Sequence, residues 1–421
     1  MKIMVVGGGG REHAIIKKIK ENKNVDEIFA LPGNGGMAND ATVVPIGAKE
    51  LDKICDFARE NKIDYAIVAP DDPLVLGLVD ELAKIGVPSF GPSKAAAIIE
   101  GSKVFSKNLM KKYSIPTAEY EVFDNADDAL KYVENCKIPT VIKADGLALG
   151  KGVIIATDRE MACDAVRSIM KDGKFGKSGD KIVIEEFLEG PEVSVLAFTD
   201  GKCVKPMVSS MDHKRIGDND TGLNTGGMGT VAPNPYYTPA IAKVCMEKIF
   251  LPTVDAMNLE NRSFKGCLYF GLMLTKDGPK VIEYNCRFGD PETQVVLPLL
   301  KSDLLEIMMA TTNGTLENVE VEFDTGAAAC VILASGGYPE SYESGFEISF
   351  EAGARENAVI AGAKEKDGKL YTAGGRVLGA IGTAKTLELA IENAYMVADK
   401  IHFEKAYRRS DIGARALRAL K

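Results

Sequence analysis

Residues 281–293 read VIEYNCRFGDPET, an apolar strand that ends in a dense set of polar groups. Because side chains alternate along a strand, Glu283 and Asn285 project from the same face and can offer two oxygens to one Mg²⁺ ion. Arg287 continues that face, and its planar guanidinium suits a carboxylate or a phosphate. The segment predicts a metal and oxyanion site at a strand end. The alternative is an ordinary strand whose polar residues merely face water.

A second segment compatible with phosphate lies upstream, where residues 141–153 read VIKADGLALGKGV. One strand ends at Lys143, a glycine-rich loop carrying Lys151 follows, and a β-branched run returns. Backbone amides of such a loop can hold phosphate oxygens, while the two lysines neutralise charge that grows during transfer. The spacing is not that of a Walker A loop. We expect a loop that closes over a triphosphate, with a hairpin of incidental lysines as the alternative.

Two further stretches join these segments. Residues 185–192 (EEFLEGPE) leave a strand and turn sharply, so that their backbone can read an adenine and a following carboxylate can bind ribose hydroxyls. Alone, this stretch is explained better by surface acids on a turn. Residues 210–229 are expected to form a long loop without secondary structure, which is usually functional or mobile. His213 in that loop is expected to be exposed and structural.

The first hundred residues alternate short apolar runs with helical patterns, which predicts a parallel sheet wrapped by helices. Turns at residues 7–10, 32–36 and 70–73 fall where such sheets bind ligands, and we expect them to line one pocket. The first turn, GGGGREHA, has a phosphate-binding geometry but lacks the third glycine of a dinucleotide fingerprint. NAD is therefore disfavoured, and a tight turn without a ligand stays the alternative.

The rest of the chain predicts a small α+β unit and then antiparallel hairpins that turn at Asp200-Gly201 and Asp277-Gly278. The last unit begins near residue 327 and carries an amphipathic helix that is expected to extend over residues 387–401. A solvated helix face explains the basic tail at residues 405–418 as well as a binding partner does.

Composition excludes several classes of protein. The chain has 421 residues with 51 Lys plus Arg against 60 Asp plus Glu, and a formal charge of -9 argues against a nucleic-acid scaffold. Eight scattered cysteines indicate reduced thiols. Three histidines are too few to make a zinc site or a His-centred catalytic triad the leading interpretation. No apolar stretch reaches membrane-spanning length and no signal peptide precedes the first strand. A compact cytoplasmic protein is expected.

Taken together, the 143–152 loop, the EEFLEGPEVS stretch and the IEYNCRFGDPETQ strand end resemble the ATP-grasp ligases in order and spacing. Within that superfamily, GGGGREHA, PGNGG, DHKR with NTGGMG, and NCRFGDPETQ are similar to the phosphoribosylamine–glycine ligase family, and AGGRVLGAIG and YRRSDIG extend the resemblance to the last unit. The resemblance implies an α/β and α+β chain with the ATP-grasp fold. It divides the chain into an N-terminal Rossmann-like parallel-sheet domain at 1–101, a central ATP-grasp domain at 102–121 and 188–325, a small lid at 122–187 and a C-terminal α+β domain at 326–421.

The resemblance also implies a reaction. Glycine and 5-phosphoribosylamine would be joined to give glycinamide ribonucleotide in purine biosynthesis, with ATP converted to ADP and phosphate through a glycyl phosphate intermediate. ATP and Mg²⁺ or Mn²⁺ are the implied cofactors, and the lid is expected to close over ATP. No protein nucleophile is required, so catalysis would depend on positioning and charge stabilisation. The implied partners are small molecules without nucleic acid or membrane, and a monomer is expected.

Site residues follow from the resemblance, motif by motif. The implied nucleotide contacts are Lys103, Lys143, Gly150, Lys151, Gly152, Glu185, Glu186, Phe187, Leu188 and Glu192. The implied metal ligands are Glu283 and Asn285. Contacts to phosphoribosylamine and glycine are implied for Gly9, Asn34, Asp71, Asp212, Lys214 and Arg287, and the catalytic set is Lys143, Asp212, Lys214 and Arg287. The family commonly has Gly-Pro-Glu where this chain has Ala69-Pro70-Asp71, so the carboxylate here is shorter by one methylene.

Three other functions stay open at this point. A different ATP-grasp enzyme, such as a purine-intermediate carboxylase or a D-alanine–D-alanine-like ligase, would share the ATP motifs and differ in the acceptor. A non-catalytic nucleotide sensor would have no need for Glu283, Asn285 and Lys143. An NAD-dependent oxidoreductase is weakened by the missing third glycine.

Overall fold

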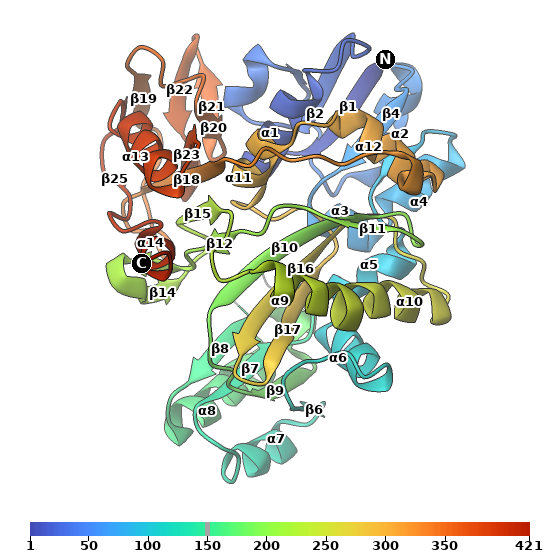
Figure 1. Cartoon of the computed structure of the whole chain (residues 1–421), viewed down its shortest axis with the longest axis vertical. Helices are drawn as coiled ribbons and strands as arrows, with labels where there is room; N and C mark the ends of the chain where they lie inside the picture. Colours follow the sequence, from blue (N-terminus) through green and yellow to red (C-terminus); the bar gives the residue numbers. More distant parts are fainter. Residues whose placement is uncertain (148–151) are drawn as a thin grey trace.

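The computed structural model describes residues 1–147 and 152–421. Its N-terminal part is a five-stranded parallel sheet in the order β3-β2-β1-β4-β5 (Figure 1). Its strands are β1 (Lys2–Gly7), β2 (Glu27–Pro32), β3 (Thr42–Val43), β4 (Tyr65–Val68) and β5 (Ser89–Phe90). Its helices are α1 (Gly10–Ile19), α2 (Leu51–Glu60), α3 (Asp71–Leu76), α4 (Leu78–Lys84) and α5 (Lys94–Gly101).

Both faces of this parallel sheet are covered. Ile3 and Val5 of β1 pack in one buried cluster with Ile15 of α1, whereas Met4 and Val6 pack in another cluster, which includes α2. A strand buried on both faces needs an unbroken apolar run instead of an alternating one, and β1 has such a run. The predicted parallel sheet is confirmed.

A small unit with its own core follows, at the lower end of Figure 1. Its antiparallel sheet has the order β6-β9-β7-β8. The elements are β6 (Tyr120–Phe123), α7 (Ala126–Val133), β7 (Thr140–Ala144), β8 (Val153–Ala156), α8 (Arg159–Val166) and β9 (Ile182–Glu186). A separate buried cluster, including Val133, Ile142 and Ile184, holds it together. This is the predicted α+β unit, and its boundaries as a lid at 122–187 stay a prediction.

The central sheet has the order β11-β10-β16-β17 and is antiparallel. Its strands are β10 (Glu192–Thr199), β11 (Val204–Pro206), β16 (Gly266–Thr275) and β17 (Gly278–Asn285). The surrounding helices are α6 (Lys103–Lys112), α9 (Pro239–Cys245), α10 (Leu251–Leu259), α11 (Thr293–Val296) and α12 (Leu304–Asn313). Both predicted hairpins are present, and Gly201 and Gly278 take the positive φ angles, 90° and 108°, that such turns require.

The C-terminal part contains two more sheets. The larger has the order β12-β15-β18-β23-β20, with β25 also paired to β18, and the smaller has the order β21-β22-β19-β24. The larger consists of β12 (Met211–Asp212), β15 (Gly229–Ala232), β18 (Ala327–Ser335), β20 (Ala358–Ile360), β23 (Arg376–Ala384) and β25 (Ala406–Tyr407). The smaller consists of β19 (Glu347–Phe350), β21 (Ala363–Lys366), β22 (Lys369–Thr372) and β24 (Ile401–His402), and the helices are α13 (Leu387–Ala398) and α14 (Ala414–Ala419).

Two expectations about local structure were wrong. The segment at 210–229 is not an irregular loop, because it contains β12, the β13 (Arg215–Gly217) and β14 (Thr221–Asn224) hairpin, and the start of β15. The first strand, β12, pairs with β15, and β15 also pairs with a distant segment, since Thr230 lies opposite Cys330 in β18. The helix expected over 387–401 ends at Ala398, because Ile401 pairs with Phe350 in β24 and β19.

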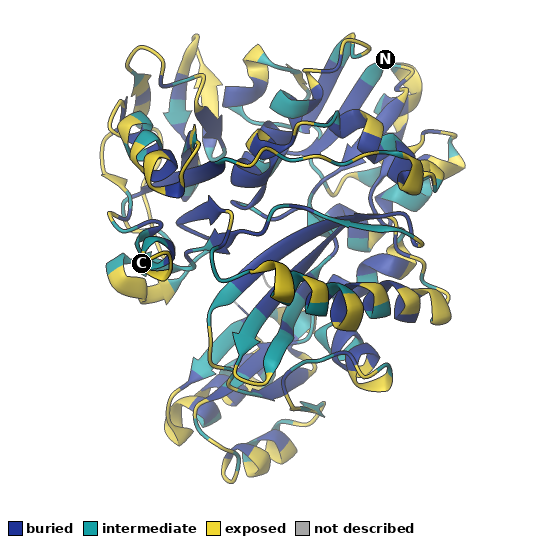
Figure 2. Ribbon diagram, in the orientation of Figure 1, coloured by how far each residue is buried: buried dark blue, intermediate teal, exposed yellow. Residues whose placement is uncertain are grey.

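Burial follows the sheets (Figure 2). Buried residues lie along the strands, while exposed residues lie on the outward faces of helices such as α9 and α10. No helix in the part of the chain that the structure describes is long and apolar enough to cross a bilayer.

Candidate active site

Glu283 on β17 lies at the centre of a cluster of cations. It stands opposite Gly271 of β16, where a side chain would crowd it, since a Cβ at Gly271 would lie 3.1 Å from Glu283 Cγ. Burial would raise the pKa of Glu283, but the charges of four cations outweigh burial and lower that pKa below its usual value. These cations are Lys214, Lys143, Lys103 and Arg287. Four segments far apart in sequence therefore meet around one ionised carboxylate, as a metal and phosphate site requires.

Two of these lysines belong to the predicted nucleotide set. Lys143 Nζ lies 3.0 Å from Glu185 Oε2 and donates to the carbonyl of Ile282 at 3.1 Å. Lys103, at the start of α6, donates to the carbonyl of Gly146 at 2.9 Å. Burial, reinforced by the charge of Lys143, lowers the pKa of Lys103 despite the nearby Glu283. An added anion such as phosphate would therefore stabilise the charged form of this lysine.

The predicted loop itself is only partly described. Gly152 is buried, and its carbonyl accepts a hydrogen bond from the Ala144 amide at 2.9 Å, which closes the base of the β7–β8 hairpin. Gly150 and Lys151 lie outside the described residues.

Glu185 on β9 links two lysines. Its Oε2 lies 3.0 Å from Nζ of both Lys143 and Lys107, and the Lys107 ammonium also donates to the Thr117 hydroxyl. Burial lowers the pKa of Lys107 to about 8. The other oxygen, Glu185 Oε1, is buried and accepts no hydrogen bond from the described residues. Sequence reasoning missed Lys107, whose signal is a lysine on the inner face of an amphipathic helix.

The remaining residues of the predicted adenine edge lie on the connection from β9 to β10. Glu186 Oε1 accepts hydrogen bonds from the Glu119 amide and from Lys280 Nζ, both at 3.0 Å. Phe187 is exposed and Leu188 is half-buried. Glu192 Oε2 lies 2.9 Å from Lys214 Nζ. This ion pair joins the expected ribose carboxylate directly to the expected substrate lysine.

One carboxylate that the motifs did not indicate orders the end of β17. Glu100 of α5 is 6% exposed and accepts hydrogen bonds from three consecutive residues. Its Oε1 accepts from Asn285 Nδ2 at 2.9 Å and from Arg287 Nη2 at 2.8 Å, while its Oε2 accepts from the Cys286 amide at 2.8 Å. Because Glu100 holds the amide nitrogen, Asn285 Oδ1 is left for the face it shares with Glu283. The available signal was a single acid in the apolar helix sequence KAAAIIEG.

Asp212 and Glu292 bring two carboxylates to the other side of the site. Asp212 Oδ1 accepts from the His213 amide at 2.7 Å, and Glu292 Oε1 accepts from the Ser194 hydroxyl at 3.2 Å. Burial, with the charge of Glu292 added, raises the pKa of Asp212 well above its usual value. Two neighbouring carboxylates of this kind favour holding a proton or a cationic amine between them.

Asp71, the first residue of α3, lies beside Arg287, with 4.0 Å between Oδ2 and Nη2. Burial would raise the pKa of Asp71, but Arg287 and Arg11 outweigh burial and lower it. The turn at 70–73 is therefore part of the cation cluster around Arg287.

Gly9 and Asn34 lie beside the C-terminal part, and a Cβ at Gly9 would lie 3.3 Å from Asp290 Oδ2. The Gly9 amide donates to Glu12 Oε2 at 2.7 Å and the Arg11 amide to Asp290 Oδ2 at 3.4 Å, so protein carboxylates already pair with these amides at the start of α1. Asn34 Nδ2 donates to the carbonyls of Gly8 and Ile360 at 3.0 and 2.9 Å. The tight-turn alternative explains these amides without a phosphate.

A cavity of about 510 Å³ borders this region, and its lining includes Gly8, Gly33, Asn34 and Gly35 together with residues 361–365. The turn at 70–73 does not contribute to it. The expectation that all three N-terminal turns line one pocket stays a prediction.

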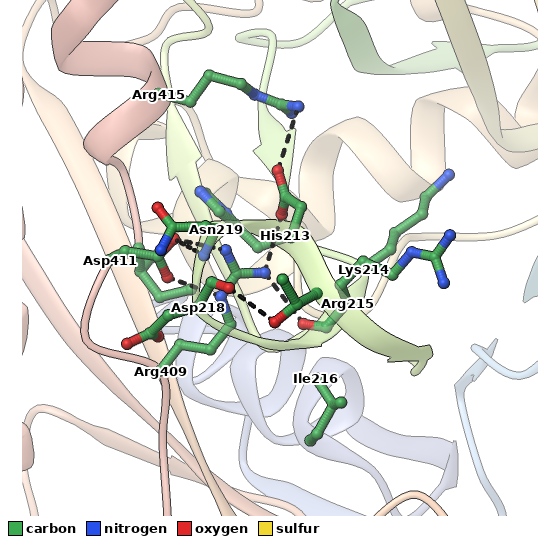
Figure 3. Close-up of polar contacts among 12 residues, drawn as sticks. His213, Lys214, Arg215, Ile216, Asp218, Asn219, Arg409, Asp411 and Arg415 are labelled. Carbon is green, nitrogen blue, oxygen red and sulfur yellow. Dashed lines mark hydrogen bonds and ion pairs between the residues drawn. The ribbon is translucent and has the colours of Figure 1, made fainter.

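A polar cluster anchors the β13–β14 hairpin, which begins next to Lys214 (Figure 3). Arg409 is 1% exposed and donates to Asp411 at 2.8 Å, to Asp220 at 2.9 Å and to the Arg215 carbonyl at 3.0 Å. The expectation of a solvated basic tail is therefore wrong at Arg409, because this guanidinium is buried against two carboxylates. Lys214 points away from the cluster.

His213 is buried and not exposed, which corrects the expectation, although its contacts are structural. Its Nδ1–H donates to the Gly229 carbonyl at 3.0 Å, and its Nε2 accepts from the Gly413 amide at 3.1 Å. Burial, helped by the charge of Arg409, lowers the pKa of His213 to about 4. The imidazole is therefore neutral at pH 7 and attaches the hairpin to the C-terminal segment.

The described residues contain no group of three or more His, Cys, Asp or Glu side chains arranged to hold a metal ion. Glu283 and Asn285 form a smaller oxygen set, which is the kind that Mg²⁺ uses when substrate phosphates and water complete its coordination. The residues therefore fit a divalent ion that binds together with a nucleotide.

Models of one known protein family match most of the chain. The phosphoribosylglycinamide synthetase models match its N domain at residues 1–100, its ATP-grasp (A) domain at 101–293 and its C domain at 328–415. A phosphoribosylamine–glycine ligase of Caldanaerobacter subterraneus subsp. tengcongensis is 49% identical over 98% of this chain and 100% of its own length. That of Clostridium acetobutylicum is 46% identical over 98% of this chain and 99% of its own length.

Solved structures agree. The crystal structure of the phosphoribosylamine–glycine ligase of Thermotoga maritima has a TM-score of 0.85 and 34% identity, and the match covers 98% of this chain and 100% of that one. A biotin carboxylase domain of Hydrogenobacter thermophilus, in complex with MgADP and bicarbonate, has a TM-score of 0.74 at 14% identity over 97% of this chain and 91% of that one, which shows a shared fold alone. The resemblance inferred from the motifs is confirmed, and the chain belongs to the phosphoribosylglycinamide synthetase family.

Proposed function

We propose that this protein is a phosphoribosylamine–glycine ligase, which uses ATP to join glycine to 5-phosphoribosylamine and releases ADP and phosphate. The observation that supports it most is the cluster around Glu283. Nucleotide-side lysines, Lys103 and Lys143, and substrate-side cations, Lys214 and Arg287, act on the same carboxylate. A reaction that transfers phosphate from ATP to a second bound anion needs both sets within reach of one site.

The nucleotide would occupy the space between the small unit and the central sheet. Lys103 and Lys143 would hold its phosphates, and Glu185 Oε1, which accepts no hydrogen bond within the part of the chain that the structure describes, offers an acceptor to an adenine amino group. Backbone groups at Glu186 and Leu188 and the carboxylate of Glu192 would contact adenine and ribose. Gly150, Lys151 and Gly152 complete the proposed phosphate loop, and Phe187 its outer edge.

Glu283 and Asn285 would hold a divalent ion, Mg²⁺ or Mn²⁺, next to these phosphates. When bound, the ion supplies positive charge to the phosphate oxygens during transfer. Glu100 keeps the Asn285 amide oriented for that role through its 2.9 Å hydrogen bond.

In the first step, Arg287 would orient the glycine carboxylate toward the γ-phosphorus. A carboxylate oxygen bonds to that phosphorus while the bond to the bridging oxygen of ADP breaks, which gives glycyl phosphate. Lys143, Lys103 and Lys214 stabilise the negative charge on the transferred group. Asp71 and Asp212 lie beside the glycine and amine positions.

In the second step, the phosphoribosylamine nitrogen attacks the carbonyl of glycyl phosphate, and phosphate leaves with the electrons of the carbon–oxygen bond. The nitrogen gives up a proton, which the carboxylates of Asp212 and Glu292 would accept. No side chain needs to become covalently attached, so the protein contributes positioning and charge.

We also place the small unit as a lid over the nucleotide, because it carries Lys143 and Glu185 on a sheet with a separate core. Hydrogen exchange of β7 and β8 should slow when ATP is added. Unchanged exchange there would remove the lid from the proposal.

The enzyme is further proposed to act as a cytoplasmic monomer. Light scattering of the purified protein at working concentration should give the mass of one 45.2 kDa chain. A mass of two chains or more would overturn that part.

An ADP-release assay over a panel of acids and amines tests the reaction. Glycine with phosphoribosylamine should release ADP, whereas larger amino acids and other amines should not, and Glu283→Ala should abolish release. ADP release with a different acid and amine, and not with glycine and phosphoribosylamine, would assign the chain to another ATP-grasp reaction.

A second assay tests the intermediate. Hydroxylamine added with ATP and glycine, in place of phosphoribosylamine, should trap glycyl phosphate as glycine hydroxamate. ADP formation without hydroxamate would contradict an acyl phosphate.

A further inference from the structure

Arg376, the first residue of β23, brings the C-terminal part into contact with the substrate side of the site. Its Nη1 donates to the Gly226 carbonyl at 2.6 Å and to the Asp290 carbonyl at 2.9 Å. It also lies 3.4 Å from the Gly227 carbonyl, and Nη2 lies 3.4 Å from Asp290 Oδ1. One guanidinium therefore connects two loops that are far apart in the sequence.

The first of these loops is a tight turn that borders Asp212. Gly227 has a φ of 109°, and a Cβ there would lie 2.6 Å from Asp212 Oδ1 and 2.5 Å from Pro291 Cδ. The position therefore needs glycine both for its backbone conformation and for lack of space. Any shift of this turn would press directly on the Asp212 carboxylate.

The C-terminal part holds Gly226 of that turn through both its amide and its carbonyl. The Gly226 amide donates to the Tyr338 hydroxyl at 3.0 Å, while the Gly226 carbonyl accepts from Arg376. The turn is thus attached through one donor and one acceptor to side chains that come more than a hundred residues later.

The second loop carries Asp290 and Glu292 at the end of the central sheet. Arg376 is close enough for Asp290, Asp212 and Glu292 all to raise the pKa of its guanidinium, against the lowering effect of burial. Its charge thus lies among three carboxylates, two of which flank the proposed position of the amine.

We propose that Arg376 is a positioning residue for the amine substrate, because it fixes the 226–227 turn and the 290–292 loop so that Asp212 and Glu292 face the attacking nitrogen. This rests on the proposed function. It gives the C-terminal part a role in the second step of the reaction, whereas the nucleotide and metal groups lie on other elements.

The test separates the two steps in Arg376→Met, Arg376→Lys and a matched control, Arg408→Met. Arg408 lies in the same part of the chain and pairs with Asp399 at the surface. Losing hydrogen bonds made by a charged group should raise the KM for phosphoribosylamine about 10- to 100-fold in Arg376→Met. Its KM for ATP and its rate of hydroxamate formation should stay within about twofold of wild type.

Arg376→Lys should recover part of the loss, since lysine keeps the charge but not the fork that reaches several acceptors. Arg408→Met should behave as wild type. Equal increases in the KM for ATP and for the amine would overturn the proposal in favour of a structural role, and so would an unchanged KM for the amine.

Tyr338→Phe covers the case in which Arg376→Met fails to fold. It removes only the hydroxyl that accepts from the Gly226 amide, so the KM for the amine should rise by a smaller factor with thermal stability maintained. No rise would count against the proposal. If the wild-type protein itself does not use glycine and phosphoribosylamine, the proposed function is wrong. That result is obtained without these variants and is therefore distinct from theirs.

Discussion

The proposed nucleotide side of the site, with Lys143, Glu185 and Glu283, and its proposed acceptor side, around Arg287 and Asp212, are built in different ways. Lys143, Glu185 and Glu283 lie at the ends of strands in two antiparallel sheets, where alternation along each strand sets which side chains face the site. The acceptor side depends on single side chains that cross from remote segments. Glu100 reaches Arg287 over 187 residues of sequence, and Arg376 reaches Gly226 over 150. The acceptor side should therefore be the more easily disturbed without loss of nucleotide binding.

The largest effect is expected at Glu283, where the two sides meet. Glu283→Gln removes the negative charge among Lys214, Lys143, Lys103 and Arg287 and one proposed metal ligand. We expect kcat/KM to fall by about 10³-fold or more, with hydroxamate formation lost as well. Glu189→Gln, at an exposed turn, is the control. Activity above a tenth of wild type would show that the two sides do not share this residue.

Glu100→Gln should sharpen the comparison, because it changes the acceptor side and the metal ligand together. An amide cannot accept from Asn285, Cys286 and Arg287 as a carboxylate does, so Asn285 loses its fixed orientation. Affinity for the metal should fall about 10- to 100-fold. The affinity for the metal is measured by titrating activity with Mn²⁺. Electron paramagnetic resonance with ADP present measures Mn²⁺ binding directly. Equal metal affinity in Glu100→Gln and the control Glu81→Gln would contradict the role of Glu100.

Acid should loosen the acceptor side through His213. Its pKa is lowered to about 4 in the folded protein, against about 6.5 when unfolded, so the unfolded chain binds more protons between these values. The free energy of unfolding should therefore decrease as pH falls from 6.5 toward 4, by up to about 3 kcal/mol from this group.

His213→Gln keeps a donor for Gly229 and an acceptor for Gly413 but cannot titrate. Urea unfolding at several pH values should show a smaller loss in this variant than in wild type. His402→Gln, which removes an exposed histidine, should leave the wild-type slope unchanged. Parallel pH profiles for His213→Gln and wild type would remove His213 as the cause.

The smallest effect concerns the glycine-rich turn at residues 7–10. Glu12 pairs with the Gly9 amide at the start of α1, in the manner of a capping box. Glu12→Gln should lower the free energy of unfolding by about 1 kcal/mol and leave the KM for ATP unchanged. Glu60→Gln, at the end of α2, is the control for stability. A tenfold rise in the KM for ATP would instead make this turn part of the nucleotide site.

Sequence could predict those parts of the molecule that depend on local pattern. Strand alternation predicted that Glu283 and Asn285 share a face, and the glycines at residues 201 and 278 predicted the two hairpins. The motifs were sufficient to identify the family and the ATP-grasp fold, and the comparisons confirm both.

Residues that act through distant partners could not be predicted in the same way. Glu100, Arg376 and Arg409 each contact a group more than a hundred residues away, and nothing near them in sequence indicates those partners. Of the strands within 210–229, β15 was missed for the same reason, since its partner β18 comes about a hundred residues later, whereas β12 pairs with β15 and β13 with β14 over short distances in sequence. The contacts of these residues depend on pairing with distant segments, which local periodicity in the sequence does not indicate.

A crystal structure with ADP and Mn²⁺, with the metal located by its anomalous signal, tests directly whether the two sides meet at one site. We expect the metal between Glu283 and Asn285, with the phosphates in contact with Lys103 and Lys143. Manganese bound elsewhere, or a nucleotide whose phosphates lie away from these two lysines, would contradict the shared site.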